Sequence, residues 1–308
     1  MHKYILKRLL MMVPVLIGVI FIMFSLSVIT PGDPAQIILG EGASAEDIAR
    51  VRQELRLDDP FFIRFINYVW GVARLDFGMS WDTQRPVSEE ILARFPHTMR
   101  LASMGVLLAL VIGIPLGILS AVKQYSILDA AATFVALLGV SIPNFWLGMM
   151  MILFFTVFLN WLPATGFTEP IQWIMPTIAI GTGSAAVIMR MTRSSMLECI
   201  RQDYIRTARA KGQTEHKVIF RHALKNTMIP VITTAGLSFG ALLGGAVLTE
   251  TIFAIPGLGR FMVDSLFRRD WPTAIGGALL IALSFSIVNL LVDILYAFID
   301  PRIRSQYR

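Results

Sequence analysis

The sequence predicts an all-α integral membrane protein with six transmembrane helices. Three observations predict this class: 55% of the 308 residues are hydrophobic, only 16% are charged, and the mean hydropathy is +0.66. Soluble domains average about 25% charged residues, and long stretches without charge are typical of membrane spans. Six such stretches are too many for a receptor or an enzyme that is held by one anchor.

The candidate spans are long enough to cross a bilayer, which takes about 20 residues of helix. They cover approximately residues 9–31, 101–122, 131–161, 171–189, 227–249 and 271–297. The first resembles a signal peptide, but the uncharged run that contains it, residues 9–32, has 24 residues and exceeds the about 7–15 of a cleavable apolar region, so we expect it to be retained. The third is overlong and contains Pro143, yet its two halves would each be too short to cross, which favours one span.

The distribution of basic residues predicts that both termini lie inside. With the N-terminus inside, the inner segments carry 16 Lys and Arg residues, whereas the two short outer loops carry 3. Short cytoplasmic loops are enriched in these residues. Residues 32–100 then form an extracytoplasmic segment, and residues 190–226 form a basic cytoplasmic loop.

The outer segment 32–100 is expected to be helical. Ser44 to Asp47 read as a capping box that opens one amphipathic helix, and Asp59 followed by Pro60 reads as the start of a second. Residues 86–95 suggest a third short helix. Such helices need an apolar surface to cover, so the segment is either a structural cap over the membrane bundle or a docking surface for a substrate-delivering protein; both can hold.

The inner loop 190–226 carries nine basic and three acidic residues, a net charge of +6 that equals that of the whole chain. Gly212 is placed to end a helix in a left-handed turn, and Thr214 could cap a second short helix. A helix–glycine–helix of this length is too long for a simple connector. The apolar positions of the first helix share one face: Leu197, Ile200, Tyr204 and Ala208.

The sequence contains no pattern typical of an enzyme. It has no P-loop, no zinc-binding His pair and no carboxylate pair inside a span, so we expect neither a cofactor nor a metal. The single cysteine, Cys199, excludes an intrachain disulfide framework. In the fifth span Gly236, Gly240 and Gly244 recur every fourth position, which favours close helix packing or a surface that slides or lines a pore.

Several motifs occur in one order along the chain: Pro31-Gly32-Asp33-Pro34, Asp76-Phe77-Gly78, the stretch Tyr204–Gly212, Pro256-Gly257-Leu258-Gly259 and Asp300-Pro301-Arg302. Together they resemble the inner-membrane permease subunit of peptide/nickel-type ABC importers, of the dipeptide-permease B type. The resemblance covers essentially the whole chain and implies a type I ABC importer permease fold.

The resemblance also implies that the inner loop holds a coupling helix seated on an ATPase. The residues concerned are Tyr204, Arg206, Thr207, Ala208, Arg209, Ala210, Lys211 and Gly212. The general permease pattern E-A-A-x-x-x-G reads Arg206-Thr207-Ala208 at its start here, and its terminal I-x-L-P reads His222-Ala223-Leu224-Lys225, which looks like a subfamily variant.

The resemblance implies four kinds of partner: a homologous second permease, two ATP-binding cassette ATPases, an extracytoplasmic substrate-binding protein and the lipid bilayer of the cytoplasmic membrane. We expect no nucleic acid among the partners. Di- and oligopeptides are the favoured substrates, because the spans lack the His, Cys or Met clusters of a metal path. Nickel and glutathione remain alternatives, and a stand-alone secondary transporter or channel is a second alternative.

Overall fold

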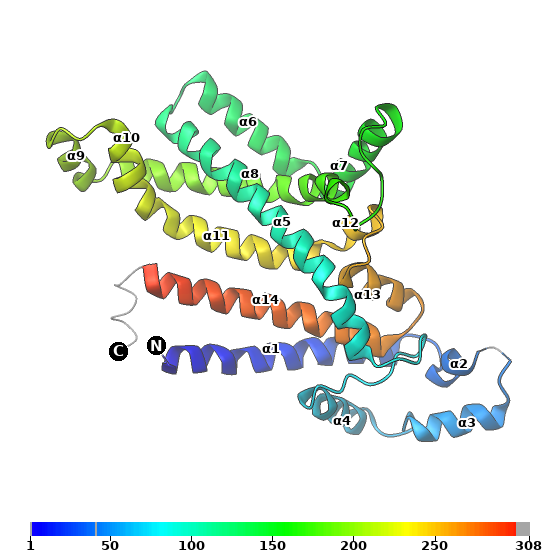
Figure 1. The fold of residues 1–308 in the computed structure, drawn as a ribbon. Coiled ribbons are helices and arrows are strands. Elements are labelled where there is room, and N and C mark those ends of the chain that lie inside the picture. Colours follow the sequence, from blue (N-terminus) through cyan, green and yellow to red (C-terminus); the bar gives the residue numbers. More distant parts are fainter. Residues whose placement is uncertain (1, 41, 300–308) are drawn as a thin grey trace. The chain divides into compact units, whose positions relative to one another are not determined.

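The computed structural model describes residues 2–40 and 42–299, and within them every regular element is a helix (Figure 1). The motif Asp300-Pro301-Arg302 lies outside the described residues. A lone antiparallel bridge joins Met79 and Pro86. The chain divides into two compact units: unit 1 comprises Met1–Ile5, Met99–Ile255 and Phe285–Arg308, and unit 2 comprises Leu6–Thr98 and Pro256–Ser284.

Within the part of the chain that the structure describes, five helices are long and apolar enough to cross a membrane. They cover Ile5–Ile29, Val87–Val122, Pro170–Ile200, Glu215–Gly245 and Trp271–Leu295. A sixth candidate is a pair of helices, Ile127–Ser141 and Asn144–Phe158, that meet at an angle of 97°. The bend falls at Pro143, which has no N–H to donate and forces the preceding Ile142 into an extended conformation.

Unit 2 contains the helices of the segment between the first two spans, together with parts of three spans. They are α1 (His2–Ile29) from Leu6 onward, α2 (Pro34–Leu39), α3 (Ala45–Glu54), α4 (Phe61–Ala73), α13 (Leu258–Phe267) and the first parts of α5 (Val87–Val122) and α14 (Trp271–Ile299). One half of the predicted capping box is confirmed, because the Ser44 side chain accepts a hydrogen bond from the Asp47 N–H; the Asp47 carboxylate accepts from the Ser44 hydroxyl. The predicted start at Asp59 is wrong: Pro60 directly precedes α4. The predicted third short helix is the beginning of α5, which continues unbroken for 36 residues.

In unit 1, α8 packs against α11, α6 and α7. The elements of this unit, besides the second parts of α5 and α14, are α6 (Ile127–Ser141), α7 (Asn144–Met151), η1 (Ile152–Phe158), η2 (Pro170–Trp173), α8 (Ile174–Ile200), α9 (Asp203–Ala210), α10 (Glu215–Lys217), η3 (Val218–Ala223), α11 (Leu224–Gly245) and α12 (Val247–Ile252). Two of them, η1 and η3, are π-helical.

Glycines allow close helix contacts inside unit 1. A Cβ added to Gly117 of α5 would lie 2.7 Å from the Met189 carbonyl oxygen of α8, so the two backbones touch there. Gly236 and Gly240 of α11 face side chains of α14, and an added Cβ at Gly240 would lie 2.5 Å from the Phe285 ring. Gly244 has open space around it. Gly236, Gly240 and Gly244 recur every fourth residue, but only the first two contact α14 side chains.

Candidate functional site

The basic inner loop contains a short helix, α9, that follows directly after α8. The expected single helix through Ala208 is wrong, because α8 ends at Ile200 and two residues separate it from α9. Gln202 precedes α9 in extended conformation. The chain therefore turns at Arg201, and α9 is a separate element of eight residues.

One face of α9 is buried and the other is exposed. Ile205 is fully buried and Ala208 is 8% exposed. They pack in a cluster with Ala121, Met196, Val218, Ile219 and Ala223. The exposed side chains of the predicted coupling residues are those of Tyr204, Arg206, Thr207, Arg209, Ala210 and Lys211. The helix is thus held by two apolar side chains while its polar face is accessible.

Gly212 ends α9 with a left-handed backbone conformation, φ +74°. Its N–H donates to the Arg209 carbonyl oxygen at 2.9 Å, and the Gln213 N–H donates to the Ala208 carbonyl oxygen at 3.3 Å. These bonds satisfy carbonyls at the helix end, and glycine adopts this φ without steric cost. No other atom lies near the position of an added Cβ. The glycine is therefore required by its dihedral angle and not by packing.

An exposed ion pair joins the two sides of the Gly212 turn. The Arg209 guanidinium donates to both carboxylate oxygens of Glu215, at 2.6 and 3.1 Å, and these bonds raise the pKa of Arg209.

Thr214 precedes α10 as expected, but its side chain makes no capping hydrogen bond. On the other side of α9, Asn226 donates to the Tyr204 hydroxyl at 2.9 Å, and burial raises the pKa of that phenol.

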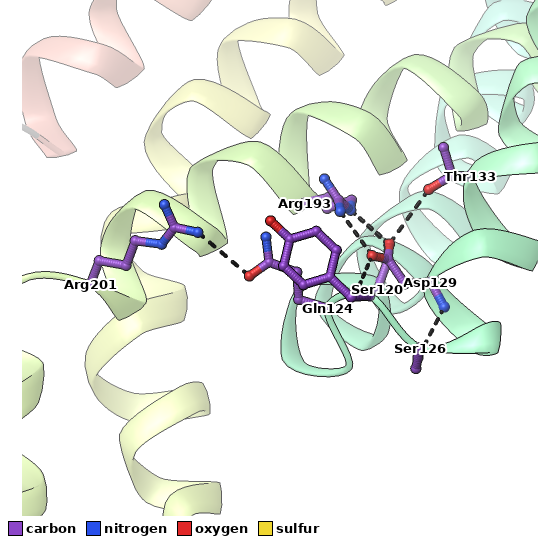
Figure 2. Close-up of polar contacts among 8 residues, drawn as sticks. Ser120, Gln124, Ser126, Asp129, Thr133, Arg193 and Arg201 are labelled. Carbon is purple, nitrogen blue, oxygen red and sulfur yellow. Dashed lines mark hydrogen bonds and ion pairs between the residues drawn. The ribbon is translucent and has the colours of Figure 1, made fainter.

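A second ion pair lies near the end of α8, and sequence reasoning missed it (Figure 2). Arg193 donates from Nε and Nη2 to the two carboxylate oxygens of Asp129, each at 2.8 Å. The same carboxylate accepts hydrogen bonds from the Ser120 hydroxyl and the Tyr125 N–H. The pair therefore joins the end of α5, the beginning of α6 and α8, ten residues before α9 starts. Asp129 is the single acid between the second and third predicted spans, which is the signal that could have indicated it.

The Pro31-Gly32-Asp33-Pro34 motif builds a corner of unit 2. One Asp33 oxygen accepts from the Ala35 N–H at 3.0 Å and caps α2, while Pro34 occupies the first helical position. The other oxygen accepts from Arg52 of α3 at 2.7 Å. Gly32 has φ +135°, which favours glycine. This motif orients α2 and α3.

The Pro256-Gly257-Leu258-Gly259 motif starts α13. The Leu258 N–H, which has no partner inside its helix, donates to the Thr98 hydroxyl at 2.8 Å in a buried position. Gly257 and Gly259 are buried as well. Pro256 and Gly257 also line a cavity of about 310 Å³ with charged side chains, among them Arg94, Arg260, Asp264, Arg268, Asp82 and Asp270.

Comparison with known proteins decides the family. Residues 113–305 match the family described as binding-protein-dependent transport system inner membrane component, and residues 1–102 match its N-terminal counterpart. The chain belongs to this permease family. The dipeptide transport system permease protein DppB of Escherichia coli K12 is 44% identical, covering 99% of this chain and 100% of its own. The glutathione transport system permease protein GsiC of Salmonella typhimurium LT2 is also 44% identical, covering 99% of each chain.

The permease is a non-catalytic subunit of an ABC transporter and a multi-pass inner-membrane protein. A solved structure with the same fold is the inward-facing MetNI methionine ABC transporter, with a TM-score of 0.56 and 19% identity over 68% of this chain and 96% of that chain. Family membership replaces the alternative of a stand-alone secondary transporter or channel. Among the described residues, no group of His, Cys, Asp or Glu could hold a metal ion.

Proposed function

We propose that this permease forms half of the translocation path for di- and oligopeptides in an ATP-driven, binding-protein-dependent importer. The observation that carries the proposal is the full-length similarity to two permeases whose names specify peptide substrates, a dipeptide and glutathione. Both substrates contain peptide bonds, and neither name specifies a metal. Nickel remains the weaker alternative.

The proposed assembly contains a homologous second permease, two ATPase subunits and an extracytoplasmic binding protein, and both termini of this chain are cytoplasmic. The basic loop supports this orientation, because nine Lys and Arg residues between 190 and 226 are expected on the cytoplasmic side. That side is also where an ATPase can reach α9.

In this proposal the stretch Tyr204–Gly212 is the contact with the ATPase. Its support is geometric: Ile205 holds one face of α9 in a buried position while the polar face is exposed, and the helix ends in a turn whose φ glycine adopts without steric cost. A displacement of α9 is passed to α8 through the apolar cluster that both helices share, which includes Met196. The ion pair of Arg193 extends this connection to α6.

The test of the substrate is uptake by the purified assembly in proteoliposomes that contain ATP. We expect a labelled dipeptide to accumulate inside in the presence of the binding protein, and nickel not to. Accumulation of nickel without competition by peptides would overturn the substrate class. Uptake that continues without ATP would overturn the importer itself.

The test of the ATPase contact is photo-cross-linking in native membranes. A photoreactive amino acid in place of Arg206 on α9 is expected to yield a covalent adduct with an ATPase subunit. The matched control is Glu54, which is also exposed on a helix but lies in the segment between the first two spans. Adducts from both positions, or from neither, would count against the assignment.

A further inference from the structure

Helix α4 is apolar on both faces, although it belongs to the segment that is expected outside the membrane. One face packs in a cluster with side chains of α1 and α14, and it consists of Phe61, Phe65, Tyr68, Val69 and Val72. The other face, which we call the outer face, consists of Phe62, Ile63, Ile66 and Trp70, whose exposed fractions are 69%, 49%, 62% and 61%. An amphipathic helix on a protein surface in water places polar residues on that side. Asn67 beside the outer face is exposed as well, but the four residues of that face are all apolar.

The contacts with α1 show how far α4 extends along this helix. Phe65 lies with its ring centroid 5.6 Å from that of Phe21 and 5.9 Å from that of Phe24. Phe61 contacts the same two rings at 6.1 and 5.5 Å. Both partners belong to a helix that is long and apolar enough to span the membrane, Ile5–Ile29. Helix α4 therefore lies beside the second half of a membrane span.

The depth of these contacts follows from the helix rise. Phe21 precedes the last residue of α1, Ile29, by eight residues, which is about 12 Å along the axis. One leaflet contributes about 15 Å of hydrocarbon. With the end of α1 taken as the outer limit of the hydrocarbon, the aromatic contacts lie at the level of acyl chains.

A shallow apolar groove continues this surface toward the middle of α1. Its volume is about 380 Å³, and it is lined by Ile17, Phe65, Ile66, Asn67, Val69 and Trp70. Next to it, α1 exposes Phe21 and Ile22, which are 45% and 60% accessible. The outer face of α4 is thus continuous with the apolar exposed side of α1.

The C-terminal end of α4 has the composition of a membrane interface. The Arg74 guanidinium lies 4.9 Å from the centre of the Trp70 ring. Tryptophan is enriched at the headgroup level, and arginine extends its charge from apolar surroundings toward headgroups. A charged Arg74 at the end of the helix is thus compatible with apolar surroundings for Trp70.

We propose that α4 is embedded in the leaflet in which α1 ends, with Phe62, Ile63, Ile66 and Trp70 in contact with lipid acyl chains. Lipid is the occupant because the face is continuous with that of a membrane span and lies at acyl-chain depth. Residues 32–100 are then not wholly extracytoplasmic: α4 is a membrane anchor within them.

The experiment measures spin-label collision rates in the complete transporter in lipid nanodiscs. Labels are placed by Ile66→Cys on α4, by Ile22→Cys on α1 and by Glu54→Cys on α3, each in a Cys199→Ser background. We expect the label at Ile66 to match that at Ile22, with frequent oxygen collisions and rare collisions with a water-soluble nickel chelate. The label at Glu54 should show the reverse.

Two outcomes would overturn the proposal. Frequent nickel-chelate collisions at Ile66 would place the outer face in water, and rare collisions with both reagents would place it against another protein. A second measurement needs no cysteine: in nanodiscs with brominated acyl chains, Trp70→Phe should reduce the part of the tryptophan emission that the bromine quenches. An unchanged quenched part would contradict the proposal.

Discussion

Two ion pairs of similar chemistry lie on either side of the turn at Arg201. In the first, the Asp129 side chain is 6% exposed and that of Arg193 27%. In the second, Arg209 is 40% exposed and Glu215 55%. The first carboxylate also accepts bonds from Ser120 and Tyr125, so its burial is compensated. The loop therefore has a fixed base, held by the pair Asp129–Arg193, and an accessible tip, which carries the pair Arg209–Glu215. Charge alone would not separate the two, because both pairs contribute to one basic segment.

The largest effect is expected at the fixed base. Asp129→Ala leaves the Arg193 guanidinium without its partner, and breaking a buried pair costs about 3–5 kcal/mol. We expect about 3 kcal/mol here because Arg193 is partly exposed. The measurement is the free energy of unfolding in mixed detergent micelles. The double variant with Arg193→Ala should lose less than the two single losses added together; additive losses would show that the residues do not interact.

The helix contact next to this pair is expected to be the second most sensitive. Gly117→Ala places a Cβ 2.7 Å from the Met189 carbonyl oxygen, and such overpacking costs about 1–3 kcal/mol. Gly244→Ala is the matched control, because its surroundings are open. We expect the control to change the midpoint of thermal unfolding little. Equal shifts for the two variants would contradict the close contact between α5 and α8.

At the tip, Gly212→Val should impair coupling more than folding. A β-branched residue at φ +74° costs about 1–2 kcal/mol, while the open space around the position adds no clash. We expect ATP hydrolysis to persist in proteoliposomes while peptide uptake falls. Gly212→Asn should restore most of the uptake, since asparagine tolerates this conformation. Normal transport by the valine variant would refute the role of the turn.

The smallest effect on stability is expected for Arg209→Ala. Exposed pairs contribute about 0.2–1 kcal/mol, so the unfolding transition should shift slightly. If the tip is a docking surface, the same variant should weaken the recovery of ATPase subunits with the purified permease. A stability loss as large as that of Asp129→Ala would erase the distinction between base and tip.

The sequence predicted the features that depend on neighbouring residues. Uncharged runs predicted the long helices, and the position of Gly212 predicted its left-handed turn, because both depend on local composition and dihedral preference. The cap at Ser44 is equally local. By contrast, Asp129 and Arg193 are 64 residues apart, and only the packing of α6 on α8 brings them together.

Boundaries between helices were harder to predict than the helices themselves. Nothing in the apolar pattern marks the interruption after Ile200, since Tyr204 and Ala208 continue the period of the preceding helix. Likewise, residues 86–95 carry a pattern of their own but continue directly into α5. The candidate coupling residues could therefore be located in the chain, whereas the shape of the site required the structure.

The π-helical segment η3, Val218–Ala223, sets the angular position of the preceding residues around the axis of α11. A π-turn holds one residue more than the α-helical turn it replaces, which shifts the angular phase of everything upstream by about 100° relative to an unbroken α-helix. If η3 were replaced by an ideal α-helix fused to the start of α11, the side chains before it would be rotated by about 100° from their positions in this structure. Deleting one residue within η3 is the geometric equivalent of rotating the basic loop about the axis of α11.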